Sequence, residues 1–173
     1  MMQMLAAGGM PVLTDHQRSA DANNPRGYFE LEAVKSLARS SVVIAEGEGK
    51  AVKVVSSLLK FLPNSHHYKM IFMRRPLDEI LVSQDRMLER LGKVVPPAPR
   101  ESVKEAFEQH LRQVQTWLLE QPNMDVRYVD YGAVLRDPVR EAMEACCFLG
   151  VELDVKAMAD KVDHALHREK AHS

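Results

Sequence analysis

Two arginines and a serine have the types and the spacing of an anion-binding site. Arg74 and Arg75 directly follow a short apolar stretch, and Ser83 lies eight positions after Arg75. Guanidinium groups bind phosphate and sulfate through paired, charge-assisted hydrogen bonds, and a serine hydroxyl can donate to the same anion. We therefore predict a phosphate or sulfate site here. The simpler alternative is an ordinary strand-to-helix connection that happens to be basic.

The elements on either side decide where these side chains lie. Residues 68–73 (Tyr-Lys-Met-Ile-Phe-Met) have the apolar, β-branched and aromatic composition of a buried strand. Pro76 suits the first turn of a helix, and apolar residues follow at helical spacing, namely Leu77, Ile80, Leu81, Leu88 and Leu91. The two arginines therefore stand where a strand ends and a helix begins. Backbone N–H groups and the helix dipole favour an anion at such a corner.

Three motifs of the chain resemble one family of enzymes. The pattern Arg-x-x-x-Glu-x-x-x-Ser, here Arg75, Glu79 and Ser83, resembles the 3′-phosphate-binding motif of sulfotransferases that use 3′-phosphoadenosine 5′-phosphosulfate (PAPS). The stretch 24–30 (Asn-Pro-Arg-Gly-Tyr-Phe-Glu) and the stretch 129–138 (Val-Asp-Tyr through Asp-Pro) resemble bacterial members of that family. The three motifs come in the family's order, and the similarity covers most of the chain.

The arginine motif departs from the family pattern at one position. The family usually has Asp or Asn straight after the arginine, and this chain has Pro76 there. A second register would put Arg74 in the arginine's place, which leaves Val82 where the serine should be. We prefer Arg75, because this register keeps Ser83.

The resemblance implies a fold, a reaction and a set of residues. The expected fold is a P-loop-type parallel sheet flanked by helices, in one α/β domain over residues 1–173. The implied reaction transfers a sulfuryl group in line from PAPS to an acceptor hydroxyl or amine of a small molecule or other acceptor, without a metal. Arg75 and Ser83 would hold the 3′-phosphate, with Arg74 in the second register. Glu30 would be the general base, and Lys53 would lie near the sulfuryl group.

The start of the chain differs from the family. Residues 1–7 are helical in pattern, and Gly8 with Gly9 is a natural stop, but no capping residue precedes them. In the family a strand and a Gly-rich phosphate-binding loop come immediately before such a helix. We therefore expect an N-terminally truncated domain that is poorly stable alone and transfers no sulfate. The alternative is a frayed N-terminal helix.

A second glycine-rich stretch does not complete a phosphate-binding loop. The run 45–50 (Ala-Glu-Gly-Glu-Gly-Lys) has Ile44 where the pattern needs glycine and Ala51 where it needs Ser or Thr. A small-molecule kinase, which needs that loop and a magnesium-binding carboxylate, is therefore a weaker alternative. A non-catalytic nucleotide-binding or protein-interaction fragment of the same fold is the other alternative.

The remaining patterns complete an alternation of strands and helices. We predict strands at 11–14, 51–55 and 126–129, and a helical turn or two over 28–37 that carries Glu30 and Glu32. A connector follows over 58–63, and helices are predicted over 102–118, 140–149 and 155–162. Ser102 and Glu105 form a capping-box pattern, and Gly150 closes a helix. The stretches 15–25, 94–100 and 164–173 read as a polar loop, a proline-rich connector or lid, and a basic end. This order predicts a parallel sheet with right-handed crossovers.

Composition limits the classes of partner. With 173 residues, 46% hydrophobic and 27% charged, the chain suits one globular domain. A net charge of -1 gives no support for nucleic-acid binding, and no apolar run approaches the ~20 residues of a membrane span. Cys146 and Cys147 are adjacent, which suits neither a disulfide nor a zinc site and predicts a reducing, cytoplasmic location. No pattern specifies an oligomeric state.

Overall fold

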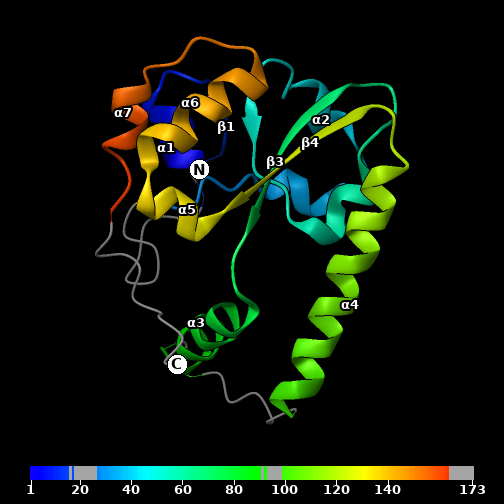
Figure 1. The fold of residues 1–173 in the computed structure, drawn as a ribbon. Coiled ribbons are helices and arrows are strands. Elements are labelled where there is room, and N and C mark those ends of the chain that lie inside the picture. Colours follow the sequence, from blue (N-terminus) through cyan, green and yellow to red (C-terminus); the bar gives the residue numbers. More distant parts are fainter. Residues whose placement is uncertain (16, 18–26, 91, 93–98, 164–173) are drawn as a thin grey trace.

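A computed structural model of the chain describes residues 1–15, 17, 27–90, 92 and 99–163 (Figure 1). In chain order its elements are α1 (Met2–Ala7), β1 (Val12–Leu13), the 3₁₀ helix η1 (Glu32–Ser36), α2 (Val42–Ala45), β2 (Ala51–Val52), the 3₁₀ helix η2 (Ser56–Phe61), β3 (Tyr68–Arg74), α3 (Leu77–Arg90), α4 (Arg100–Leu119), β4 (Met124–Asp130), α5 (Tyr131–Arg136), α6 (Pro138–Leu149) and α7 (Val155–Ala159). Most of the predicted loop at 15–25, most of the proline-rich stretch at 94–100 and the end at 164–173 lie outside the described residues.

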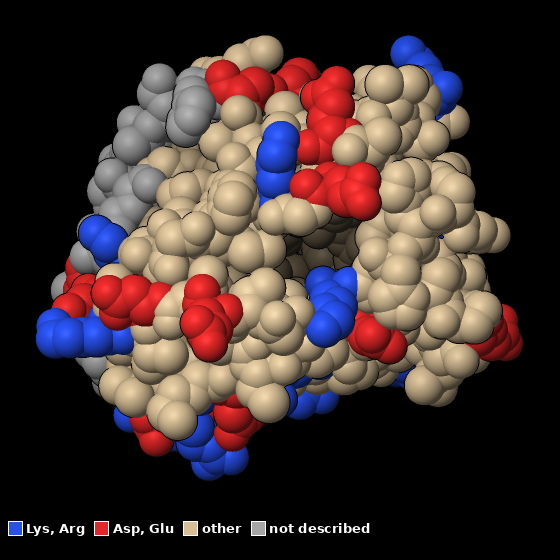
Figure 2. Space-filling view, turned by 90° about the horizontal axis from the view of Figure 1, so that it is seen from above, with Lys and Arg blue, Asp and Glu red and all other residues tan. Residues whose placement is uncertain are grey.

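The strands form two small parallel sheets. β1 pairs with β2, so that Val12 lies opposite Ala51, and β3 pairs with β4 from Tyr68 opposite Met124 to the last residues of both strands. The predicted α/β class and the parallel pairing are therefore confirmed, whereas the single sheet is divided in two in the described chain, because no pairing joins β2 to β3. The arrows of β2, β3 and β4 point toward the same end of the molecule in Figure 1. Figure 2 views the opposite end, where these strands begin.

Two apolar clusters lie on opposite sides of the strands. The α4-side cluster is built on Val34, Leu37, Val43, Ile44, Leu59, Leu62, Leu118 and Met124. The α6-side cluster is built on Met4, Leu5, Val129, Val134, Ala142, Ala145 and Met158. Successive side chains of a strand point to opposite faces, and those of β3 enter the two clusters in turn, Met70 and Phe72 on one side and Ile71 and Met73 on the other. The apolar composition of β3 follows from this burial on both faces.

Several helix boundaries match the sequence pattern. α1 ends at Ala7 and α3 begins directly after Pro76, as predicted. α6 ends at Gly150, whose φ of 70° is the left-handed conformation that glycine adopts at low cost. The predicted connector at 58–63 falls mainly within η2, and the helix α5 had no counterpart among the predictions.

The predicted capping box at Ser102 is wrong. α4 begins at Arg100, its N-cap position is Pro99, and no side chain caps it. Tertiary contacts hold its first turn instead: Lys104 Nζ lies 3.1 Å from Asp78 Oδ2, and an Arg100 Nη2 donates to the Asp78 carbonyl at 3.3 Å. Contacts with α3 therefore extend the helix beyond the point at which its local sequence would start it. None of the described helices combines the length and the apolar character that a bilayer span requires.

Candidate functional site

Polar side chains gather where the strands end. Thr14 and Asp15 follow β1, Lys53 follows β2, the arginine pair ends β3, and Asp130 ends β4. Because the strands of each sheet are parallel, their carboxyl ends meet at one edge, and this edge is where α/β folds place ligands. The two sheets thus present two polar edges, one around Lys53 and one around Arg75.

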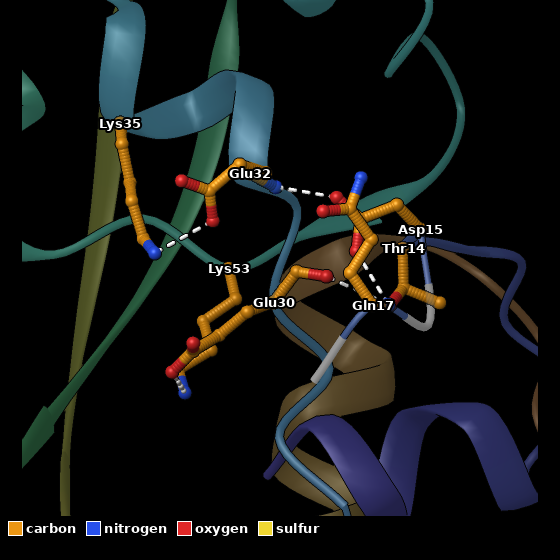
Figure 3. Close-up of polar contacts among 7 residues, drawn as sticks. All are labelled: Thr14, Asp15, Gln17, Glu30, Glu32, Lys35 and Lys53. Carbon is orange, nitrogen blue, oxygen red and sulfur yellow. Dashed lines mark hydrogen bonds and ion pairs between the residues drawn. The ribbon is translucent and has the colours of Figure 1, made fainter. Parts of the chain in front are cut away.

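At the first edge Lys53 binds the segment that carries Glu30. Its Nζ donates to Glu30 Oε1 at 3.1 Å (Figure 3). It also donates to the Tyr28 carbonyl at 3.1 Å. The two side chains are partly exposed, 36% for Lys53 and 27% for Glu30. An ammonium and a carboxylate at this distance form a charge-assisted hydrogen bond, which fixes the position of the Glu30 side chain. The structure therefore brings together the two residues that the sequence proposed for catalysis.

Both residues lie outside the elements predicted for them. A short helix does form within the predicted stretch 28–37, but η1 begins at Glu32, so it carries Glu32, and the prediction that it also carries Glu30 is wrong. Gly27 and Phe29 both have positive φ, 83° and 50°, and this irregular backbone is incompatible with a helix. Lys53 follows β2 instead of lying within it, because the ladder with β1 ends at Val52.

Side chains at the end of β1 hold the Glu30 segment in place. Thr14 Oγ1 donates to the Glu30 carbonyl at 2.8 Å, and Asp15 Oδ2 accepts from the Glu32 backbone N–H at 2.6 Å. Asp15 thereby satisfies an N–H group at the first residue of η1. Glu32 turns its carboxylate to Lys35 at 2.6 Å, away from Lys53 (Figure 3). A hollow of about 280 Å³ opens here, lined by Asp15, Gln17, Glu30, Glu32 and Lys35.

At the second edge Arg75 lies against the first turn of α3. Its Nε donates to Glu79 Oε2 at 2.8 Å, and its guanidinium carbon is 5.1 Å from the centre of the Tyr131 ring. Ser83 is half-buried one turn beyond Glu79. Positions four apart share a face of a helix, so Glu79 and Ser83 lie on the same face of α3. Glu79 orients Arg75 at the start of this helix face, and the shared role predicted for Arg75 and Ser83 stays a prediction.

Arg74 has a different partner. Its Nε donates to Asp130 Oδ1 at 3.0 Å and an Nη2 donates to Asp130 Oδ2 at 3.2 Å, while the guanidinium carbon is 5.4 Å from the Tyr128 ring centre. The pair is exposed and joins the last residues of β3 and β4, which lie opposite one another. Two donors of Arg74 are thus committed to a carboxylate of the neighbouring strand.

Sequence reasoning missed the residues that support these side chains. Thr14 and Asp15 received no role, and Glu79, Asp130 and Tyr131 appeared only as parts of motifs. The available signal was position, since each polar residue directly follows an expected strand or lies one helical turn from an arginine. Of the motif at 24–30, residues 24–26 lie outside the described residues.

A larger hollow lies apart from both edges. Its volume is about 470 Å³ and its lining comes from one face of α4, namely Gln109, Arg112, Gln113, Thr116, Trp117 and Glu120. None of these residues lies at a strand end, so the volume of a hollow does not by itself identify the functional site. In the part of the chain that the structure describes, no group of three or more metal-ligating side chains occurs.

Comparison of the chain with known protein families, with curated proteins and with solved structures found no match.

Proposed function

We propose that this protein is a sulfotransferase-like, PAPS-binding member of the P-loop-type α/β folds. Arg75 and Ser83 bind the 3′-phosphate of the nucleotide, and Glu30 with Lys53 faces the acceptor hydroxyl or amine. The observation that carries the proposal is the corner between β3 and α3, where Arg75 donates to Glu79, and Glu79 shares a face of α3 with Ser83.

Arg75 is both oriented and available at this corner. Glu79 takes the Nε donor, and the two terminal nitrogens have no acceptor among the described residues. A guanidinium can bind a phosphate through such terminal donors while another carboxylate fixes its plane. The side chain is 24% exposed, which shields the contact from water but leaves a phosphate access.

The contacts of the two arginines favour the register with Arg75. Arg74 already gives two hydrogen bonds to Asp130, so a phosphate would have to displace that carboxylate. Arg75 would keep its bond to Glu79 and add new ones. This difference supports Arg75 as the phosphate ligand and Arg74 as a link between β3 and β4.

The Glu30–Lys53 pair suits the acceptor side of the reaction. As the acceptor oxygen or nitrogen forms its bond to sulfur, its proton passes to the Glu30 carboxylate. The bond between sulfur and the 5′-phosphate oxygen breaks, and adenosine 3′,5′-bisphosphate leaves. Lys53 orients Glu30 through their hydrogen bond and stands beside the charge that develops during the transfer.

Calorimetry with two nucleotides tests the phosphate site. Adenosine 3′,5′-bisphosphate should bind more tightly than adenosine 5′-monophosphate, which lacks the 3′-phosphate. Arg75→Ala should remove about 1.5–3 kcal/mol from binding of the bisphosphate, a loss of about 10- to 150-fold, with little effect on the monophosphate. Arg74→Ala is the matched control, because it removes the neighbouring guanidinium and should leave the difference between the nucleotides intact.

Two outcomes would contradict the assignment. Equal affinities for the two nucleotides would show that the protein has no 3′-phosphate site. A loss of bisphosphate affinity in Arg74→Ala alone would show that Arg74, and not Arg75, binds the 3′-phosphate. Binding without sulfuryl transfer would favour the alternative of a non-catalytic nucleotide-binding protein. Phosphoryl transfer from a nucleoside triphosphate would favour a small-molecule kinase.

A further inference from the structure

The helix α6 has apolar side chains on two opposite sides. Its inner side enters the α6-side cluster through Ala142, Ala145 and Leu149. A helix that packs on a core through one side normally has polar residues on the other side. On α6 that other side carries four residues spaced four apart, which we call the outer row: Val139, Met143, Cys147 and, directly after the helix and Gly150, Val151.

All four residues of the outer row are exposed. The exposed fraction is 49% for Val139, 58% for Met143 and 38% for Val151, and Cys147 is exposed as well. The other large apolar side chains that are exposed in the described chain are spread over α2, α4 and the region of η2. Single exposed apolar residues are normal on a protein surface, whereas a row of neighbouring ones indicates a contact surface.

The spacing of the outer row fits a second copy of the same helix. In the commonest class of helix packing, rows of residues four apart on both helices interdigitate at an angle of about −50°. Two identical helices can do this with the same row, as a two-fold axis requires. An antiparallel alignment about the middle of the row brings Val139 to the partner's Val151 and Met143 to the partner's Cys147. Each residue of the row then meets another residue of the row.

The charges at the two ends of the outer row favour the antiparallel alignment. Arg136 ends α5, three positions before Val139, and Glu152 directly follows Val151. Both charged side chains are exposed, and neither has an ion-pair partner among the residues that the structure describes. An antiparallel pair places Arg136 of each copy near Glu152 of the other, whereas a parallel pair places like charges together. The antiparallel alignment also sets the two helix dipoles in opposite directions, which is favourable.

We propose that the outer row of α6 is the contact surface of a homodimer in which the α6 helices of two copies pack antiparallel. A single row of four residues makes a small interface, so the dimer is weak, with a Kd on the order of 10–100 µM. This inference stands on the exposure, the spacing and the charges along α6 and does not rest on the proposed nucleotide site.

Sedimentation equilibrium of the 173-residue chain tests this surface. The chain would be measured from about 5 to 500 µM, with a reducing agent that keeps Cys147 from forming a disulfide. Met143→Lys places a charge in the middle of the outer row and should raise the Kd at least about tenfold. Leu119→Lys is the matched control, because Leu119 is 87% exposed on α4, outside the row, and its replacement should leave the Kd unchanged. Far-UV circular dichroism would show that both variants remain folded.

Charge reversals test the alignment of the two helices. Arg136→Glu and Glu152→Arg should each raise the Kd about three- to tenfold, because each puts like charges together at both ends of the row. The double variant again has opposite charges at both ends and should bring the Kd back to within about twofold of its original value. A chain that stays monomeric over the whole concentration range, or a dimer that Met143→Lys and Leu119→Lys weaken equally, would overturn the proposal. A double variant that dimerises as weakly as the single variants would refute the antiparallel alignment.

Discussion

Glu30 and Glu32 are carboxylates two positions apart that contact different lysines. Glu30 binds Lys53 and lines the edge where β1 and β2 end, whereas Glu32 binds Lys35 within η1. Both lie beside the same hollow, so they differ chiefly in partner. This contrast makes Glu32 a matched control for the catalytic role proposed for Glu30.

Glu30→Gln should lower turnover far more than nucleotide binding. Glutamine keeps the size of the side chain but cannot accept the acceptor's proton, so kcat should fall by about 10²- to 10⁴-fold in a form of the protein that transfers sulfate. The Kd for adenosine 3′,5′-bisphosphate should change by less than about twofold, because we propose that this ligand binds at Arg75 and not at Glu30. Glu32→Gln should leave both constants near their original values. Equal turnover in the two variants would show that Glu30 is not the general base and has only a structural role.

Glu144 makes the junction of β4 and α6 sensitive to acid. Its carboxylate accepts hydrogen bonds from Arg140 Nε at 2.8 Å and from an Nη2 of Arg127, and these bonds, that of Arg140 first, lower its pKa from the usual value of 4.5. The folded chain therefore binds this proton more weakly than the unfolded chain does. The resulting stabilisation is present above the unfolded pKa and is lost as pH falls through the folded one.

The stability difference between the natural chain and Glu144→Gln should therefore depend on pH. The difference in unfolding free energy should be largest near about pH 7 and should approach zero as the pH falls toward about 3. Urea unfolding midpoints at a series of pH values would show the convergence. Glu152→Gln, at an exposed carboxylate between α6 and α7, should give a difference that is small at every pH. A Glu144 effect that stays constant across the range would contradict the ion-pair explanation.

At the scale of elements, Gly8 sets how closely α1 approaches α7. A Cβ placed on Gly8 would lie 2.6 Å from Met158 Cγ and 3.0 Å from Leu153 Cβ, and Met158 is fully buried. The φ of Gly8 is -74°, so an alanine would suffer no backbone strain. The glycine is therefore required for space, not for conformation.

Gly8→Ala should destabilise the chain by about 1–3 kcal/mol, the usual cost of overpacking a tight core. Its cost should shrink in the Met158→Ala background, where the two nearest clashing atoms, Cγ and Sδ of Met158, are gone and only the contact with Leu153 Cβ remains. A double-mutant cycle by urea unfolding measures this coupling, which should exceed about 0.5 kcal/mol. Additive effects would show that α1 and α7 do not meet at Gly8.

At the scale of the whole molecule, both apolar clusters draw on both sheets. Val52 and Phe72 enter one, Ala51 and Ile71 enter the other, so neither sheet can lose its contacts without opening both clusters. The molecule should accordingly unfold as one unit despite its divided strands.

Truncations in the two clusters should therefore shift one shared transition. Leu118→Ala in the α4-side cluster and Met158→Ala in the α6-side cluster each remove a buried side chain, 3% and 0% exposed, and each should cost about 2–5 kcal/mol. Circular dichroism at far-UV wavelengths and Trp117 fluorescence should report the same midpoint in each variant. Two separate transitions, each moved by only one of the substitutions, would mean that the layers fold independently.

Local sequence determined the elements whose side chains repeat with a clear period. The apolar run of β3, the helical spacing after Pro76 and the glycine that ends α6 each carry their own signal, because backbone conformation depends on near neighbours. The position of Arg74 and Arg75 between a strand and a helix followed from the same signals.

Tertiary structure alone decided the partners of those side chains. Lys53 meets Glu30 from 23 residues away, and Arg74 meets Asp130 from 56 residues away, because strand pairing brings distant strand ends to one edge. The start of α4 and the division into two sheets likewise depend on long-range contacts. Local propensity carries no information on these contacts. The same strand residues can pair with any neighbouring strand that supplies backbone hydrogen bonds and an apolar layer to pack against.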